Sequence, residues 1–453
     1  MSRALTVLGR PGTWIAVAVL LLALPTAGDA SSSAAVTPSD LALVVAALLA
    51  AKELLRGRHL AMARSIPALG FLAIALMSLV AAAVARNFPD NLIGGLRFVE
   101  LFLLAPVAVM VALRNRTDAA VVLGSVLGLG LFEGVLGLVQ FATGTGAGIG
   151  AESIRAVGTF GAYNIGTLAH LTAMGYVICL AAAVVQRGSL RWWGAAGAAV
   201  FALANVAALS RGAWVAMALA TVVVLSRGRP ARLLVTVVTV GLLGALILPP
   251  LVVGGSPVGE RLGSLLVADS TPDQSLTDRE ALWRAAGQMA LDHPLTGVGP
   301  RAFPDVRDAY ADFSLLGSSD ISLGTSFARV ELKSPHSLYL LIASEQGLLA
   351  AVVFVAVLAV LLARGLVRAA RRRSDLSTTV ALMGVGLLAY EIMVMVTGDL
   401  GGPGSILTGV ALGLAGWAAA DLDLLGGAGT SARPEEDAPI GTPQPVPVGA
   451  GAR

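Results

Sequence analysis

The sequence predicts an all-α integral membrane protein with about twelve transmembrane helices and one large polar loop on the outer face. The first observation is composition: 56% of the residues are hydrophobic, 13% are charged and the mean hydropathy is +0.81, whereas soluble domains carry about 25% charged residues. The second is a series of apolar segments long enough to cross a bilayer. The third is an uneven distribution of Lys and Arg between these segments.

Twelve apolar segments follow one another along the chain, with one long interruption. They cover residues 13–26, 40–55, 66–85, 92–113, 117–141, 163–186, 191–209, 211–226, 231–253, 336–363, 376–398 and 402–420. The first could also be the core of a signal peptide, because Arg3 and Arg10 precede it. Only a short polar hairpin separates it from the second segment, so we interpret it as a helix.

The positions of Lys and Arg predict the orientation of these helices. With a cytoplasmic N-terminus, the cytoplasmic segments carry 20 of them and the short outer loops only 3. Positive charge accumulates on the cytoplasmic side of membrane proteins. Both termini are therefore predicted to be cytoplasmic, and the long segment 254–335 to be extracytoplasmic.

This topology predicts four regions. Residues 1–253 form the first part of the membrane domain with helices 1–9, and residues 254–335 form an extracytoplasmic loop or cap. Residues 336–423 contain helices 10–12, and residues 424–453, rich in Pro, Gly and Ala, are predicted to be a disordered cytoplasmic tail.

Within the loop, the pattern predicts two helices. Thr277 to Glu280 matches a capping box and predicts a helix start, followed by apolar residues at helical spacing. His293-Pro294 predicts the end of this helix, and a second short helix is expected at 302–313. The one cysteine, Cys179, excludes an intrachain disulfide.

Few charged residues lie within the predicted spans, and each is a candidate for function. Arg97 and Glu100 are three residues apart, so they can pair on one helix face, either as a structural ion pair or as the lining of a polar cavity. A structural role is favoured for Glu133 and Glu391. His170 is a further titratable group within a span.

A second set of polar residues falls on the predicted outer side. Arg211 stands where two apolar segments meet, and an arginine on that side needs an anionic partner such as a lipid phosphate; snorkelling to the headgroups is the alternative. Arg279, Arg284 and Arg301 flank the loop helix and its Gly-rich turn, and His336 follows Pro335 where the chain re-enters the membrane. Pro335 is expected to begin the tenth helix. Arginines with one histidine suit group transfer from a lipid diphosphate, because guanidinium groups stabilise the leaving diphosphate and a neutral imidazole accepts a hydroxyl proton. No outer pattern suggests a metal.

Several fragments in this order resemble the O-antigen ligase and polysaccharide polymerase superfamily, from about residue 150 to 420. They are Ser210-Arg-Gly-Ala-Trp214, Arg279-Glu-Ala-Leu-Trp283, Asp292-His-Pro-Leu-Thr-Gly-Val-Gly-Pro300 with Phe303, His336-Ser-Leu-Tyr339, Glu345-Gln-Gly347-Leu-Leu, and, more weakly, Arg155-Ala-Val-Gly-Thr-Phe160 with Asn164. The superfamily has about twelve spans and a large outer loop between the ninth and tenth, as in type C glycosyltransferases.

The resemblance implies a metal-independent glycosyltransferase or ligase of cell-envelope polysaccharide biosynthesis that needs no cofactor and no nucleic acid. Its donor would be a glycan on a polyprenyl diphosphate such as undecaprenyl diphosphate, and its acceptor a hydroxyl on a glycan, lipid or protein. Arg211 and Arg279 would hold the diphosphate and His336 would activate the acceptor hydroxyl. The implied substrate-binding residues are Arg284, Arg301, Arg155, Tyr339 and Glu345.

Three alternatives stay open at the level of sequence. A polysaccharide polymerase of the same superfamily would move the glycan onto another lipid-linked repeat and would share the site. A secondary transporter could also have twelve spans, but transporters place polar groups near the membrane midplane, often in two related halves. A non-catalytic, flippase-like protein would share the topology without needing His336.

Overall fold

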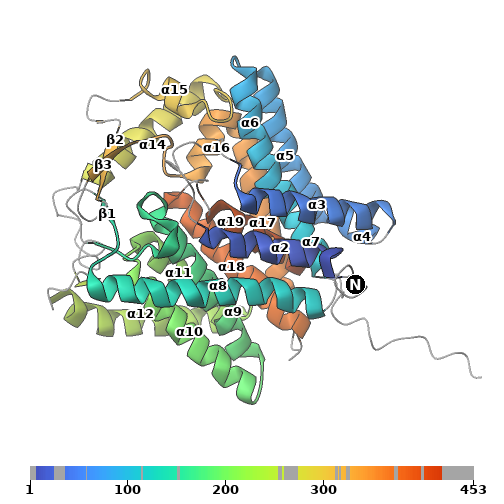
Figure 1. The fold of residues 1–453 in the computed structure, drawn as a ribbon, viewed down its shortest axis with the longest axis vertical. Helices are drawn as coiled ribbons and strands as arrows, with labels where there is room; N and C mark the ends of the chain where they lie inside the picture. The colour runs from blue at the N-terminus through green and yellow to red at the C-terminus, as the bar shows by residue number, and fades with distance from the viewer. Residues whose placement is uncertain are drawn as a thin grey trace, which may run out of the picture.

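The computed structural model describes residues 7–24, 36–57, 59–113, 116–149, 154–253, 258–259, 274–311, 315, 318–322, 327–371, 376–398, 402 and 404–420. The predicted tail at 424–453 lies outside the described residues. Figure 1 shows a bundle of helices with a smaller group of elements at one end.

The first third of the chain forms helices whose starts are set by local signals. Thr37 and Asp40 form a capping box at the start of α3, and Ser65 caps α5. The helices are α2 (Pro11–Leu20), α3 (Pro38–Leu55), α4 (Leu60–Ala63), α5 (Ile66–Val84), α6 (Phe88–Val99), α7 (Ala105–Ala112) and α8 (Arg116–Thr143). A 3₁₀ turn, η1 (Leu21–Ala23), follows α2, and a π-helical segment, η2 (Glu100–Leu104), joins α6 to α7.

The rest of the chain is also mainly helical. It contains α9 (Ile165–Val185), α10 (Ser189–Ala207), α11 (Arg211–Ser226), α12 (Pro230–Val253), α14 (Gln274–Asp292), α15 (Phe303–Arg307), α16 (Leu338–Gln346), α17 (Leu348–Ala369), α18 (Leu376–Thr397) and α19 (Gly404–Ala420). Two 3₁₀ turns, η3 (Gly158–Phe160) and η4 (Ala162–Asn164), precede α9.

Helices α18 and α19 lie at the centre of the bundle. Nearly every side chain of α19 is buried, including Trp417, and α18 is buried over most of its length. They pack on each other and on α7, α9, α11 and α17 (Figure 1). Glycines permit this close packing: a Cβ on Gly384 would lie 2.5 Å from the Leu414 carbonyl oxygen.

The length and composition of the helices confirm an all-α membrane protein. Among the described residues six helices are long and apolar enough to cross a membrane: 66–84, 88–112, 116–143, 166–185, 348–369 and 376–397. Four shorter apolar helices cover 11–21, 211–226, 230–242 and 404–420. Each predicted segment falls on helix, but α3 and α10 belong to neither of these two groups. The expected count of twelve spans is therefore not confirmed.

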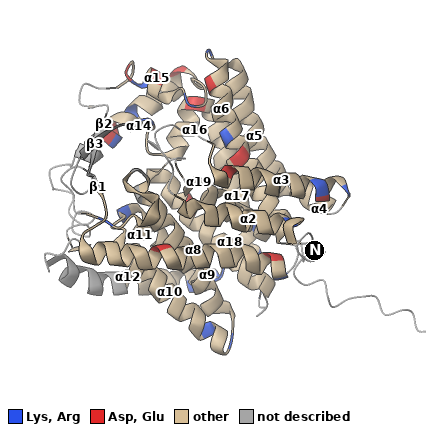
Figure 2. Ribbon diagram, in the orientation of Figure 1, with Lys and Arg blue, Asp and Glu red and all other residues tan. Residues whose placement is uncertain are grey.

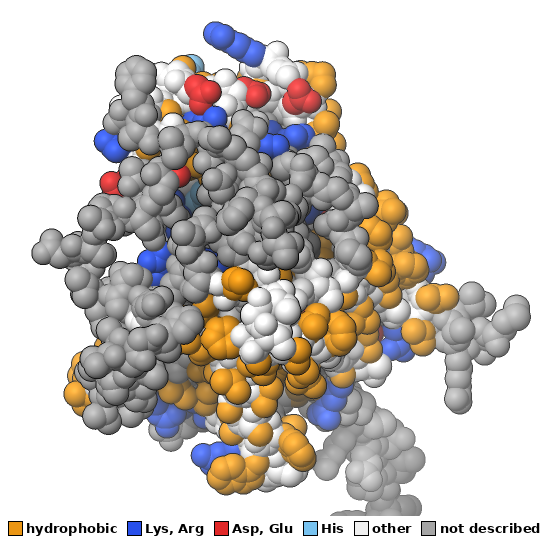
Figure 3. Space-filling model, turned by 60° about the vertical axis from the view of Figure 1, so that its left-hand side comes forward, with side chains coloured by type: hydrophobic (Ala, Val, Ile, Leu, Met, Phe, Trp, Pro, Cys, Tyr) orange, Lys and Arg blue, Asp and Glu red, His pale blue; other side chains and the backbone are white. Residues whose placement is uncertain are grey.

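The outer surface of the bundle is apolar, as a lipid-facing surface requires. Exposed leucines and valines lie along α5, α8, α12 and α17. In Figure 3 hydrophobic side chains cover the lower and right-hand parts of this face, whereas acidic ones gather at its upper end. Figure 2 likewise shows few charged residues in the middle of the bundle.

The elements at one end of the bundle are α14, α15 and a three-stranded antiparallel sheet; we call them the cap and the adjoining end of the bundle the cap end. The strands, in the order β1-β2-β3, are β1 (Gly148–Ile149), β2 (Ser318–Ser322) and β3 (Phe327–Glu331). The sheet is a small departure from an entirely helical fold. Because β1 comes from the α8–α9 connection, two distant segments build the cap.

Three expectations for this region are corrected. Helix α14 begins at Gln274 rather than at the capping box at Thr277, although it ends at Asp292 as predicted. Helix α15 covers only Phe303–Arg307 of the expected 302–313. The predicted tenth span, 336–363, is divided into α16 and α17 at Gly347, whose φ of +93° a helix cannot accommodate.

Candidate functional site at the cap end of the bundle

Arg211 is the first residue of α11, immediately after a tight turn from α10. Leu209 in this turn has a φ of +48°, which is uncommon for a residue with a branched side chain. The indole of Trp214 donates to the carbonyl of Asn205 at 3.4 Å, and the buried Asn205 amide donates to Ala169 on α9 at 2.7 Å. These contacts fix the position of Arg211, which is half-buried.

His336 lies in a second strained turn. Its φ is +49°, and its backbone amide donates to Ser334 Oγ at 3.2 Å. The indole of Trp283 on α14 donates to the Pro335 carbonyl at 2.8 Å. Helix α16 begins at Leu338, with Ser337 as its N-cap. The prediction that Pro335 begins a helix is therefore wrong, because the turn places His336 outside the helix.

The C-terminal end of α18 brings the Arg211 and His336 turns together. The amide of Leu338 donates to the Gly398 carbonyl at 2.9 Å. On the other side, a Cβ on Gly212 would lie 2.9 Å from Thr397 Oγ1, so the start of α11 rests directly on the last turn of α18. Residues that are more than 120 positions apart in the chain thus meet at one place.

Helix α14 carries two further predicted residues on different faces. Arg279 lies one turn before Trp283, on the face directed toward the His336 turn, and is half-buried. Arg284 is exposed, and its Nε lies 3.4 Å from the Glu280 carbonyl on its own helix. Of the two, Arg279 is the better placed to share a ligand with His336.

The Gly-rich turn before Arg301 pairs with the end of α16. The amides of Val298 and Gly299 donate to the carbonyls of Ser344 and Glu345, both at 2.9 Å. Gly297 and Gly299 have positive φ, and a Cβ on Gly297 would lie 2.2 Å from the Glu345 carbonyl carbon. The two fragments of this region that carry the resemblance therefore form one backbone-paired unit.

Glu345 is enclosed by this unit. The residue is only 3% exposed and its Oε1 accepts the Phe303 amide at 3.1 Å. Burial raises the pKa of Glu345 to about 7. Hydrogen bonds from the backbone amides of Arg301 and Phe303 act to lower this pKa. In this geometry Glu345 holds the backbone that carries Arg301, which has a φ of +71°.

Arg301 and Tyr339 connect the site to the membrane helices. A Cβ on Gly94 of α6 would lie 2.8 Å from Arg301 Cγ, so the arginine stem rests on α6. The hydroxyl of Tyr339, one turn after His336, donates to the Ile392 carbonyl of α18 at 2.9 Å, and its ring packs on Phe354. Tyr339 therefore fixes the start of α16 on the bundle.

Arg155 lies in the connection between β1 and α9, before the 3₁₀ turn η3. It forms an antiparallel bridge with Ala147 and is buried. The next amide, of Ala156, donates to the carbonyl of Ala207 at the end of α10 at 3.1 Å. The loop thus contacts the turn that leads to Arg211.

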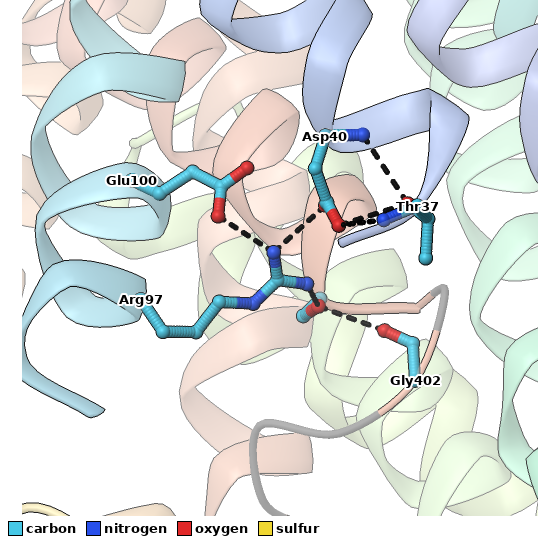
Figure 4. A network of polar contacts seen from close by, with 6 residues as sticks. Thr37, Asp40, Arg97, Glu100 and Gly402 are labelled. Carbon is cyan, nitrogen blue, oxygen red and sulfur yellow. Dashed lines mark hydrogen bonds and ion pairs between the residues drawn. The ribbon is translucent and has the colours of Figure 1, made fainter. Parts of the chain in front are cut away.

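A charged network surrounds Arg97 of α6 (Figure 4), three residues after Gly94, on which the Arg301 stem rests. Arg97 Nη1 lies 2.7 Å from Asp40 and 2.6 Å from Glu100, and Nη2 donates to Ser405 Oγ at 3.0 Å. The predicted Arg97–Glu100 pair is confirmed. Asp40 was missed, because 57 residues separate it from Arg97 and no local spacing signals the contact.

A second pair, which is buried, joins α9, α18 and α19. His170 Nε2 lies 2.6 Å from Glu391 Oε1, and Thr408 donates to the other carboxylate oxygen at 3.1 Å. The sequence analysis named His170 and Glu391 separately, with a structural role favoured for Glu391, and only the fold pairs them. Among the described residues, no group of three His, Cys, Asp or Glu side chains is arranged to hold a metal ion.

Residues 196–355 match the family model of the O-antigen ligase, Wzy_C. This part of the chain, about a third of its length, is similar to that family. The match confirms the resemblance to the O-antigen ligase and polysaccharide polymerase superfamily. No curated protein gives a match. The matched residues contain the Arg211 turn, α14, the Gly-rich turn and the His336 turn, whereas Arg155 lies outside them.

Proposed function

We propose that the protein transfers a glycan from a polyprenyl-diphosphate donor to an acceptor hydroxyl on the outer face of the membrane, as a ligase or a polymerase of the superfamily. The observation that carries this proposal is the convergence of the Arg211 turn and the His336 turn on the C-terminal end of α18, with Arg279 on the adjoining helix. The cap end would then be extracytoplasmic and both termini cytoplasmic, as the 20 to 3 charge bias predicts.

The chemistry follows from the residue types. The acceptor oxygen attacks the anomeric carbon of the donor, the bond from that carbon to the diphosphate oxygen breaks, and His336 takes the hydroxyl proton. Arg211 and Arg279 hold the charge of the departing diphosphate, because the planar guanidinium offers paired donors to phosphate oxygens. The rest of the lipid-linked glycan would be bound by Arg301, Arg284 and Arg155.

A reconstituted transfer assay tests the proposal. Purified protein in lipid nanodiscs would receive a polyprenyl-diphosphate glycan and an acceptor, and product would be measured for wild type, Arg211→Lys, Arg279→Lys and His336→Ala. We expect loss of most activity in the Lys variants and a reduction of about 10²- to 10⁴-fold without the base. Arg191→Lys, at the opposite end of the bundle, is the matched control. Wild-type specific activity in all three site variants would refute the mechanism.

The lipid-linked glycans that accumulate in a strain lacking the protein would distinguish a polymerase from a ligase. A deletion strain that accumulates single lipid-linked repeats would indicate a polymerase. Accumulation of long lipid-linked chains would indicate a ligase. Mass spectrometry of the lipid-linked glycans makes the distinction directly.

A further inference from the structure

Glu133 on α8 is a fully buried carboxylate with a defined partner. Its Oε2 accepts the Thr159 amide at 2.8 Å, and its Oε1 accepts the Thr159 hydroxyl at 2.6 Å. In the part of the chain that the structure describes, it forms no ion pair with Lys or Arg. A carboxylate buried without a cation is costly, and it is retained only where its hydrogen bonds are well made.

Gln140, two turns further along α8, holds the same loop. Its Oε1 accepts the amides of Val157 and Gly158 at 2.9 and 2.8 Å, and its Nε2 donates to the Gly158 carbonyl at 3.0 Å. Backbone that lies among membrane helices but outside an α-helix needs such partners, because lipid supplies none. Glu133 and Gln140 together satisfy most of the polar backbone of residues 157–159.

The contact is too close to admit any other residue at Gly158. Its φ is +64°, and a Cβ there would lie 2.2 Å from Glu133 Oε2. An alanine at 158 would therefore be strained and would displace the carboxylate. The conformation of the loop and the position of the Glu133 side chain therefore depend on each other.

The loop contacts the end of α10, which leads into the Arg211 turn. Directly before Val157, the Ala156 amide donates to the carbonyl of Ala207, the last residue of α10. Arg211 follows four residues later, after the strained Leu209. The chain of contacts runs from Glu133 through the loop to the turn that aims the arginine.

We propose that Glu133 is a positioning residue for donor binding: through the loop at 156–159 it fixes the turn that presents Arg211 to the diphosphate. The inference rests on the proposed role of Arg211. Glu133 itself moves no proton and does not touch the substrate. Its loss should weaken donor binding more than the chemical step, because the base and the acceptor side of the site are carried by other segments.

Three variants distinguish geometry from charge. Glu133→Gln can keep both contacts, since its oxygen accepts the Thr159 amide and its NH₂ donates to a reoriented Thr159 hydroxyl. Glu133→Ala removes both, and Gly158→Ala displaces the carboxylate from the other side. We expect Glu133→Gln to stay within about 2-fold of wild type, and the two Ala variants to lose about 10- to 100-fold in kcat/KM, mainly through the KM of the donor, as for a binding group moved by about 1 Å.

The readout separates positioning from a merely structural role. Activity is normalised to folded protein, and hydrogen exchange of the 156–159 amides is measured in the same samples. We expect faster exchange in Glu133→Ala but not in Glu133→Gln. An unchanged donor KM in both Ala variants, or a Glu133→Gln variant as impaired as Glu133→Ala, would overturn the inference.

Different results would contradict the positioning role of Glu133 and the proposed function. If Arg211→Lys and His336→Ala lose transfer while Glu133→Ala keeps a normal donor KM, only the positioning role is wrong. If Arg211→Lys keeps wild-type transfer and donor KM, the diphosphate role of Arg211 is wrong, and the positioning role fails with it.

Discussion

Replacing Glu345 by Gln tests how the Gly-rich turn is held on α16. Glu345 lies before the span that starts at Leu348, and its Oε1 accepts the Phe303 amide. Burial raises its pKa from an ordinary 4.5 to about 7. The carboxyl therefore changes charge near neutral pH, whereas Gln keeps an oxygen for Phe303 and does not titrate.

The sign of the pH dependence follows from the direction of this pKa shift. A carboxyl whose pKa is raised by folding favours the folded state most below its unfolded pKa, and this contribution is lost as the pH rises toward the folded pKa. The rise from 4.5 to about 7 corresponds to about 3 kcal/mol. Most of it is lost between about pH 5 and pH 7.

The assay is thermal unfolding of the purified protein in nanodiscs between pH 5 and pH 8.5. We expect wild type and Glu345→Gln to differ by about 1 kcal/mol or less at pH 5, and the variant to be the more stable by up to about 3 kcal/mol at pH 8. Glu280→Gln, on the exposed face of α14, is the control and should follow wild type. Parallel curves for wild type and Glu345→Gln, or a less stable variant at pH 8, would refute the reasoning.

Three further predictions concern the turns and the topology. Trp283→Phe removes the hydrogen bond to Pro335; we expect a loss of about 1 kcal/mol in unfolding free energy and a lower kcat, because the His336 turn is loosened. Gly347 has a φ of +93°, and a Cβ there would lie 2.6 Å from the Leu295 carbonyl, so Gly347→Ala should lower the unfolding free energy by about 2 kcal/mol or more. Gly287→Ala is the control: its Cβ would meet open space, and the change should be neutral or slightly stabilising. Ser270→Cys in a Cys179→Ala background should react with an impermeant thiol reagent in intact cells; reaction only after lysis would place this segment inside.

The positions of the membrane helices could be predicted because lipid imposes one strong constraint. A segment that crosses a bilayer must be apolar and helical, so length and hydropathy suffice to locate it. The break at Gly347 was missed because Glu345-Gln-Gly interrupts an apolar run too briefly to alter its average. The sheet was missed for a related reason: its strands have two to five residues, and Ser318–Ser322 shows little of the alternation that marks a strand.

The candidate site was predictable in its residue types but not in its contacts. Arginine and histidine near predicted helix ends suggested phosphate chemistry from the sequence alone. The groups that hold them are distant in the chain: Trp283 reaches Pro335 across 52 positions, and Glu133 reaches Thr159 across 26. Glu133 was interpreted as structural, and nothing in its local sequence indicates that its partner is a loop beside the Arg211 turn.

Backbone strain at the cap end supports a functional interpretation of the same turns. Leu209, Arg301 and His336 have φ between +48° and +71°, and each lies in or next to a fragment that matched the family. Such conformations cost of order 1–3 kcal/mol each and persist only where the surroundings enforce them. Here the enforcing contacts are visible: Trp214 on Asn205, Phe303 on Glu345, and Trp283 on Pro335. Glycine adopts such conformations without this strain, as Gly297 and Gly347 do. His59 and Arg227 also have positive φ, so this conformation alone does not mark a site. At the cap end it coincides with contacts that set the directions of Arg301 and His336, two side chains proposed to act on the substrate.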